Sequence, residues 1–268
     1  MRLVQLSDLE PVKDWYATNP FVKGGYRPPY TGVWSSLFEW HNETLIIYTH
    51  FLPGLYWLYW LFAFPYDTQT SLTTKCLIGY AYAAASFMGL SSGFAHIAHT
   101  MDPSWALFCW KMDYLGIVAI NLGHELLDCF LLFHSYPTLL GAVYIIKILF
   151  AAYCCKEILK GATTSLWGLL YPLIGMATFT LPVALHPSLV VQRFAHYSLG
   201  TTLFVCIAAT LFYVGKLPER IWNPNGVFDM VNSHVWHHLF IVASIVCGFQ
   251  ALPELHRITE PLTISRRG

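Results

Sequence analysis

Seven apolar stretches follow one another along this chain of 268 residues, and each is close to the length that crosses a lipid bilayer. A helix needs about 20 apolar residues to span the hydrocarbon core. Only 11% of the residues are charged, whereas a soluble domain carries about 25%, so too few charges remain to cover a water-facing surface. The sequence therefore predicts an integral, multi-pass membrane protein, an all-α bundle of seven transmembrane helices at residues 42–64, 75–98, 106–133, 137–155, 163–185, 191–215 and 230–252.

The short breaks between these stretches carry turn residues or charges, which predicts one transmembrane domain with two flanking segments. Residues 1–41 form an N-terminal segment, residues 42–252 the seven-helix domain and residues 253–268 a C-terminal tail. The N-terminal segment has no apolar core and is not expected to be a signal peptide.

The basic residues predict the orientation of the bundle. Lysines and arginines are more frequent on the side that holds the N-terminus, and such loops normally face the cytoplasm. We therefore expect a cytoplasmic N-terminus and a C-terminus outside. Counting spans from there places His96, Asp113, His234 and His238 together in the inner leaflet.

Charge and cysteine usage exclude other classes of protein. The formal net charge is zero and the chain has no basic run, so we expect the lipid bilayer and no nucleic acid as a partner. The seven cysteines show no C-x-x-C spacing. Cys154 and Cys155 lie in an apolar run and are expected to be thiols in the membrane rather than parts of a disulfide framework.

His234 and His238 begin the last apolar stretch and share one face of a helix because they are four residues apart. Imidazoles at the mouth of a membrane span are costly unless they have a use, and a transition metal is a common use for paired neutral imidazoles. His237 lies off this face and is left out of the predicted ligand set.

Ser92 and His96 repeat this four-residue spacing at the inner end of the second stretch. Taken alone, the pair could be a hydrogen bond that ties two helices together. At the same depth as His234 and His238, however, His96 completes a set of three histidines, which is typical of a zinc site with one open position.

Asp113 lies at the same predicted depth, on the third stretch. A carboxylate in the membrane needs a partner. Lys111 or a nearby arginine would make it structural, whereas a water molecule activated by zinc would make Asp113 a general base.

The remaining polar residues of the spans receive simpler interpretations. His99 ends a helix and could be solvated, and Glu43 could close the inner mouth of the bundle. Single imidazoles with a partner on a neighbouring helix are expected at His50 and His196. A second polar cluster in the outer leaflet has no assigned chemistry and comprises His124, Glu125 and Asp128.

Three blocks of the sequence carry a family resemblance. They are Gly25-Tyr26-Arg27-Pro28 with His41-Asn42-Glu43-Thr44 and His50, then Ser92-x3-His96 with Asp113-Tyr114-x-Gly116, and finally Leu217-Pro218-Glu219-Arg220 with Ser233-His234-x3-His238. In this order they resemble the progestin and adipoQ receptor family, which includes the adiponectin receptors and is similar to haemolysin-III-type proteins and alkaline ceramidases. The resemblance implies seven helices, a cytoplasmic N-terminus, and zinc on His96, His234 and His238 with Ser92 and Asp113 beside it. Adiponectin receptors of this family are associated with ceramide hydrolysis.

The sequence departs from the family pattern at two positions and in length. Val235 stands where the family usually has glutamine, and Ile46 where it often has asparagine. The glutamine position lies beside a metal ligand, so Val235 predicts looser support of the metal. The short N-terminal segment resembles the small fourth-type members more than the adiponectin receptors, so adiponectin is not the expected ligand.

Three functions are compatible with these residues. The first is a zinc-dependent amide hydrolase of a ceramide-like lipid, with Asp113 as general base and Ser92 donating to the developing oxyanion. The second is a signalling receptor with a structural zinc, an unknown ligand or signalling partner, and no catalysis. The third is haem ligation by pairs of histidines, against which the ordered blocks argue. The Golgi, the endoplasmic reticulum and the plasma membrane all fit the sequence.

Overall fold

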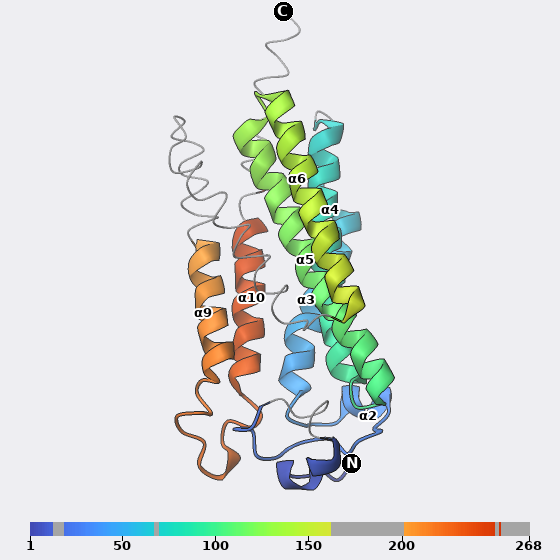
Figure 1. Cartoon of the computed structure of the whole chain (residues 1–268), viewed down its shortest axis with the longest axis vertical. Coiled ribbons are helices and arrows are strands. Elements are labelled where there is room, and N and C mark those ends of the chain that lie inside the picture. Colours follow the sequence, from blue (N-terminus) through green and yellow to red (C-terminus); the bar gives the residue numbers. More distant parts are fainter. Residues whose placement is uncertain (13–18, 67–69, 162–200, 250–251, 253–268) are drawn as a thin grey trace, which may run out of the picture. The chain divides into compact units, whose positions relative to one another are not determined.

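The computed structural model describes residues 1–12, 19–66, 70–161, 201–249 and 252 of the chain. All secondary-structure elements within these residues are helices. Val4 and Tyr26 form an isolated β-bridge outside any strand. The all-α prediction is confirmed for the described part. Its longer helices are α3 (Thr44–Ala63), α4 (Leu72–Ala98), α5 (Pro103–Phe133), α6 (Pro137–Lys160), α9 (Thr201–Gly215) and α10 (Ser233–Phe249), and its short ones are η1 (Leu6–Val12), α2 (Val33–Phe38) and η3 (Pro224–Gly226) (Figure 1).

These six long helices coincide with six of the seven predicted spans. The fifth predicted span, residues 163–185, lies outside the described residues, as do the first part of the sixth, His196 and the tail 253–268. Among the described helices, α3 and α6 are long and apolar enough to cross a bilayer, and α10 is apolar but shorter.

Local sequence explains several of the helix ends. Pro137 stands at the first turn of α6, where its missing N–H is not needed. Gly161 ends the same helix with φ of 83°, a left-handed conformation that glycine adopts without strain. Asp102 accepts hydrogen bonds from the backbone N–H groups of Ser104 and Trp105 and so caps the start of α5.

The chain divides into two compact units. The first unit comprises Met1–Leu55, Met88–Asp113 and Val205–Ala243, and the second comprises Tyr56–Phe87, Tyr114–Phe204 and Ser244–Gly268. The helices α3, α4, α5, α9 and α10 therefore contribute residues to both units. All three blocks of the family resemblance begin in the first unit.

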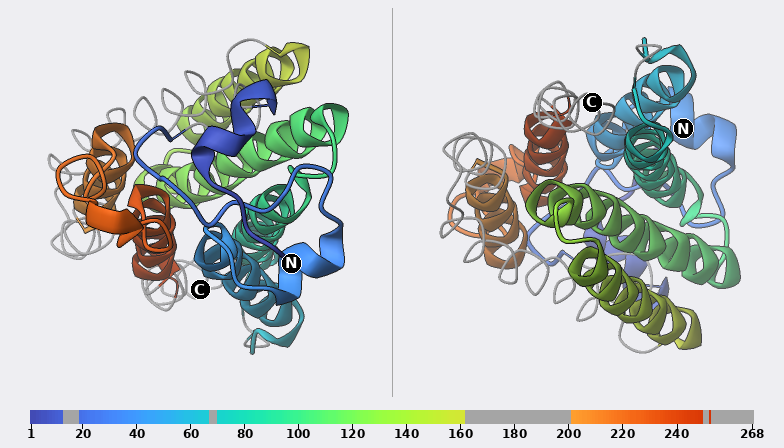
Figure 2. Two further views of the ribbon diagram at one scale, coloured as in Figure 1. Left: turned by 90° about the horizontal axis from the view of Figure 1, so that it is seen from below. Right: turned by 90° about the horizontal axis from the view of Figure 1, so that it is seen from above.

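Within the first unit, the N-terminal segment lies across the ends of the helices. Both the view in Figure 1 and the view from below in Figure 2 show this segment, in dark blue, at the end where α3 and α10 begin. Asp229 holds it in place by accepting hydrogen bonds from the backbone N–H groups of Lys23 (3.0 Å) and Gly24 (2.7 Å). Gly25 follows with φ of 77°, so a side chain at this position would be strained.

Two glycines bring α3 and α4 close together in the same unit. A Cβ added to Gly89 would lie 2.7 Å from the Cα of Gly54 and 2.7 Å from the carbonyl oxygen of His50. Small residues at a crossing allow helix backbones to approach closely in membranes. This crossing places the segment around His50 directly against the segment around Ser92.

The second unit contains the packing between α5 and α6. Val118 on α5 packs with Ala151, Cys154 and Ile158 on α6 in a fully buried cluster. Cys154 and Cys155 are free thiols and neither takes part in a disulfide, while their place in the membrane stays a prediction. Leucines and isoleucines on α6 are largely exposed, as expected for a surface that contacts lipid.

Candidate metal centre

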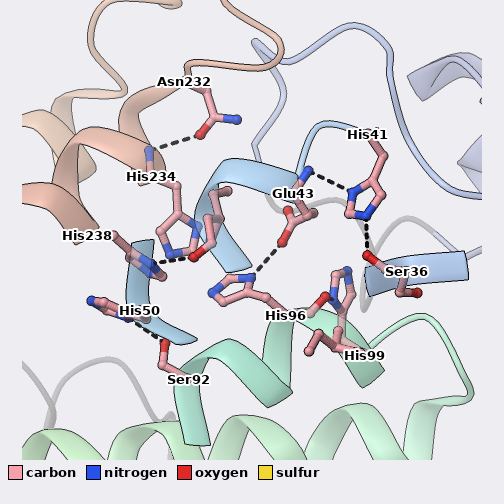
Figure 3. Close-up of polar contacts among 12 residues, drawn as sticks. Ser36, His41, Glu43, His50, Ser92, His96, His99, Asn232, His234 and His238 are labelled. Carbon is pink, nitrogen blue, oxygen red and sulfur yellow. Dashed lines mark hydrogen bonds and ion pairs between the residues drawn. The ribbon is translucent and has the colours of Figure 1, made fainter. Parts of the chain in front are cut away.

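Three histidines from two helices come together in the first unit. His96 lies in the last turn of α4, and His234 and His238 lie in the first turns of α10 (Figure 3). One ligand atom from each of the three rings lies within 4.8 Å of the other two. The structure thus groups the three residues that the sequence analysis selected as metal ligands.

His96 presents one nitrogen to the centre and uses the other for a hydrogen bond. Its Nδ1 lies 2.6 Å from Oε2 of Glu43, the residue that precedes α3. Its Nε2 is buried and has no hydrogen-bond partner among the described residues. Buried polar atoms in proteins nearly always have a partner, so this nitrogen indicates a ligand that the protein itself does not supply.

His238 is oriented in a similar way. Its Nδ1 lies 3.1 Å from the carbonyl oxygen of Ile46 on α3, so Nδ1 carries the proton and Nε2 keeps a lone pair for a metal. The ring is 2% exposed. A hydrogen bond on the far nitrogen is the usual way in which proteins fix a ligating histidine.

The start of α10 is capped from two directions, which places His234 and His238. The side-chain oxygen of Asn232 accepts a hydrogen bond from the backbone N–H of His234 at 3.0 Å. Glu219, from the Leu-Pro-Glu-Arg block, accepts hydrogen bonds from both the backbone N–H and the hydroxyl of Ser233. Asn232 and Glu219 together thus fix the start of the helix that carries two of the three histidines.

The donor set fits zinc. Three imidazoles leave a fourth position open in a tetrahedral site, and the carboxylate of Glu43 behind His96 is the outer partner that such histidines normally have. A second group of possible ligands, Glu43, His96 and His99, also lies within 4.8 Å. The guanidinium of Arg27 lies 3.4 Å from Nδ1 of His99, and this fixed positive charge disfavours a cation there.

Ser92 and Asp113 lie beside the three histidines. The hydroxyl of Ser92 lies near enough to the carboxylate of Asp113 on α5 to interact with it, and Asp113 lies near enough to His96 for their charges to interact. Ser92 is therefore the candidate hydrogen-bond donor to Asp113. A hydroxyl has one proton, so Ser92 can donate to a substrate oxygen only when that proton leaves Asp113.

His50 contributes more to this region than the sequence indicated. The expected partner on another helix is Ser92, whose Oγ lies 2.9 Å from Nδ1 of His50. The imidazole ring also stacks on that of His238, with 3.6 Å between ring centroids. The prediction of a single imidazole with one partner on a neighbouring helix did not include this second contact, because residue spacing along α3 carries no information about α10.

The interpretation of His99 as a solvated residue was wrong. Its side chain is 3% exposed, and burial lowers its pKa to about 3. Beside it, Arg27 is fully buried and donates hydrogen bonds to the carbonyl oxygens of His96 (2.7 Å) and Ile97 (3.0 Å). These carbonyl groups belong to the last turn of α4, where the helix itself supplies no backbone partner. Arg27 therefore caps the C-terminal end of the helix that carries His96.

Two residues of this region carried a sequence signal whose meaning was not recognised. Arg27 and Glu43 both belong to the first block of the resemblance. Glu43 was expected to close the mouth of the bundle, and its contact with His96 gives it a more specific place. His237, which was left out of the ligand set, points to α9 instead, where its Nδ1 lies 3.1 Å from the carbonyl oxygen of Ala209.

The second polar cluster belongs to the second unit. Glu125 on α5 pairs with Lys147 on α6 at 3.5 Å, and both side chains are buried. Asp128 lies near enough to both for their charges to interact. Lys147 was counted with the basic residues that orient the bundle but was not identified as a partner of this cluster, because it lies within an apolar stretch.

Comparison with known proteins decides the family. Residues 38–249 match the family model described as Haemolysin-III related. The chain belongs to this family. The matched segment contains every residue of the candidate metal centre except Arg27.

Relatives of this haemolysin-III-related chain include several receptors. It is 25% identical to Heptahelical transmembrane protein 3 of Arabidopsis thaliana, over 90% of this chain and 83% of that protein. It is 24% identical to Membrane progestin receptor alpha of Sus scrofa, over 91% of this chain and 74% of the receptor. It is also 25% identical to ADIPOR-like receptor IZH1 of Eremothecium gossypii, over 94% of this chain and 84% of that protein. The resemblance to the progestin and adipoQ receptors is confirmed, and the chain is a membrane protein of this receptor family. The placement near the small fourth-type members stays a prediction.

Proposed function

We propose that this protein is a zinc-dependent hydrolase that cleaves the amide bond of a ceramide-like lipid within the membrane. The observation that supports it most directly is the buried, unpartnered Nε2 of His96 beside two further imidazoles, with a carboxylate from another helix next to them. Three protein ligands and an open position are the arrangement of catalytic rather than structural zinc.

His96, His234 and His238 would hold the metal. A zinc ion in this position would polarise the amide carbonyl and lower the pKa of a water molecule to about 7. Glu43 accepts the Nδ1–H of His96 and keeps the Nε2 lone pair of that ring directed at the other two imidazoles.

Asp113 is the proton carrier in this proposal. Its carboxylate comes from α5, which supplies no ligand, and its charge interacts with that of His96. It would take a proton from the attacking water and deliver it to the leaving amine. Ser92 holds that carboxylate through its hydroxyl, and once Asp113 is protonated the same hydroxyl can donate to the oxygen of the substrate.

The apolar surface near the site supports a lipid as the substrate. The metal ligands lie on α4 and α10, and exposed apolar side chains on the neighbouring α3 face the surroundings of the bundle. Acyl chains suit such surroundings. The ceramide class comes from the family resemblance, in which the adiponectin receptors are associated with ceramide hydrolysis.

A receptor without catalysis is the second candidate, because relatives of this chain are named as receptors. In that case zinc would hold α4 and α10 together, and an unidentified ligand or signalling partner would act on the bundle. The two proposals agree on the metal and differ on turnover.

Purified protein with measured zinc content, given ceramide labelled on the acyl chain, separates them. Release of labelled fatty acid in proportion to zinc content is expected for the hydrolase. Zinc-loaded protein that releases no fatty acid would overturn the hydrolase proposal and leave the receptor.

A further inference from the structure

His50 makes two contacts with the candidate metal centre through different parts of its ring. Its face lies parallel to the ring of His238, with centroids 3.6 Å apart and an interplanar angle of 13°. Its edge contacts Ser92, with 2.9 Å between Nδ1 and Oγ (Figure 3). The side chain is 4% exposed. One residue of α3 therefore contacts both a candidate metal ligand on α10 and the serine on α4 that holds Asp113.

The hydrogen-bond network determines which nitrogen of His50 carries the proton. If Ser92 donated to Nδ1 of His50, the proton of the ring would lie on Nε2, where a buried N–H would have no partner, so Nδ1 carries the proton and Oγ of Ser92 accepts it. The proton of Ser92 is then available for Asp113, with which its hydroxyl interacts. Nε2 of His50 then keeps a lone pair, and this nitrogen is buried without a partner among the described residues. The order of donation runs from His50 to Ser92 and from Ser92 to Asp113.

The parallel stacking excludes His50 as a further ligand of the same ion. The lone pair of an imidazole lies in the plane of its ring. Two parallel rings 3.6 Å apart direct their lone pairs along parallel lines, which cannot meet at the roughly 2.0–2.1 Å that zinc requires from each nitrogen. His50 accordingly acts on the centre through its neighbours.

His238 needs a neighbour of this kind. Its Nδ1 is held by the carbonyl oxygen of Ile46 at 3.1 Å and lies 3.4 Å from the hydroxyl of Thr49. A hydrogen bond at one edge of the His238 ring still allows the ring to rotate about that bond. The flat ring of His50, packed against the face of His238, prevents this rotation. Thr49 and His50 follow Ile46 by three and four residues, so the three residues lie on one face of α3 and this face provides all three contacts with His238.

We propose that His50 is a positioning residue whose ring face holds His238 for the metal and whose Nδ1–H holds Ser92, and through it Asp113, for proton transfer. This inference rests on the function proposed above. The face and the edge of the ring serve different neighbours, so two substitutions can remove them one at a time.

His50→Phe keeps a flat ring against His238 and removes the donor to Ser92, whereas His50→Asn keeps a donor near the position of Nδ1 and removes the ring face. Each purified variant is titrated with zinc against a competing chelator, and its rate of ceramide hydrolysis is measured at full zinc loading. His124→Phe is the matched control, because His124 is another buried histidine of the bundle with an unpartnered Nε2 and belongs to the second unit.

We expect His50→Asn to bind zinc roughly 10–100-fold more weakly with a near-normal turnover number when loaded, as for other residues that support a ligating histidine. His50→Phe should bind zinc as wild type does and turn over roughly 10–100-fold more slowly. The control should change neither property. Equal losses of both properties in both variants, or no loss in either, would overturn the inference.

Failure of the proposed function can be told apart from failure of this inference. If wild type binds zinc and does not hydrolyse ceramide, the hydrolase proposal is wrong, and the zinc titration still decides whether the ring face of His50 supports His238. In that case, weaker zinc binding by His50→Asn but not by His50→Phe supports the inference, and equal binding by all proteins overturns it. Melting temperatures of the zinc-free variants identify a change that comes from folding alone.

Discussion

The two buried polar clusters of this protein differ in how their groups are paired. In the second unit, Glu125 and Lys147 form an ion pair between α5 and α6, so opposite charges balance each other. In the first unit, the three imidazoles face one another, and Nε2 of His96 has no partner among the described residues. A buried ion pair needs no ligand, whereas three imidazole nitrogens that converge on one point are an arrangement that suits a metal ion. The comparison separates a structural polar pair from a candidate site without reference to the family.

The largest expected effect concerns the histidines themselves. His96→Ala, His234→Ala and His238→Ala should each remove nearly all bound zinc, because two remaining imidazoles do not make a stable site in water. His237→Ala should leave the zinc content unchanged, since its ring contacts α9. Elemental analysis of the purified variants measures this. Loss of zinc in His237→Ala equal to that in His238→Ala would mean that the wrong face of α10 had been chosen.

Asp113→Asn should keep zinc and lose turnover. Asparagine has the size of aspartate and can accept a hydrogen bond from Ser92, but it cannot carry a proton. The rate of ceramide hydrolysis should fall by roughly 10²–10⁴-fold, the usual contribution of general acid–base catalysis. Zinc content and rate are measured on one sample. An Asn variant that hydrolyses as fast as wild type would exclude Asp113 as the base, and one that loses zinc would make it a ligand.

Lys147→Met tests the buried ion pair of the second unit. Removal of one partner of a buried ion pair costs about 3–5 kcal/mol in free energy of unfolding, because a buried charge loses its counterpart. Zinc content should not change. The double variant Lys147→Met with Glu125→Leu should recover most of the stability, as measured by thermal unfolding in detergent. If Lys147→Met lowered zinc binding, the two clusters would not be independent.

Glu43→Ala is expected to have the smallest effect of the four. Without the carboxylate behind it, His96 is less well oriented and a weaker ligand, and zinc affinity should fall by roughly 10–100-fold. Glu43→Gln, which can still accept the proton on Nδ1 of His96, should fall between Ala and wild type. Titration against a chelator provides the measurement. A zinc affinity of Glu43→Ala equal to that of wild type would show that the hydrogen bond does not support the metal.

Much of this fold could be predicted because a bilayer limits the choices. Helix boundaries such as those of α3 and α4 follow from apolar length and from breaks at proline and charged residues. The grouping of His96 with His234 and His238 could be predicted from helical spacing and depth. The orientation of the bundle stays a prediction, which tag accessibility at the C-terminus tests.

Contacts that depend on side-chain direction across helices could not be predicted. The ring stacking between His50 and His238 requires the close crossing of α3 and α4 at Gly54 and Gly89 as well as the angle of α10. Arg27 was quoted only as part of a motif, because no periodicity connects an irregular segment with the carbonyls at the end of α4. Lys147 was passed over for a related reason: an isolated lysine in an apolar stretch reveals no partner until the neighbouring helix is placed.

The hydrogen bond between Lys23 and Asp229 sets the order in which this protein can be completed. The two residues are 206 positions apart. At the usual 5–20 residues per second, a ribosome needs roughly 10–40 s to make the chain between them. Throughout that interval the segment that ends with Arg27 has been made but cannot be fastened, and α10 with His234 and His238 does not yet exist. The candidate metal centre is therefore among the last parts of the first unit to form, and a chain whose synthesis stops before residue 229 lacks both the partner of Lys23 and two of the three histidines.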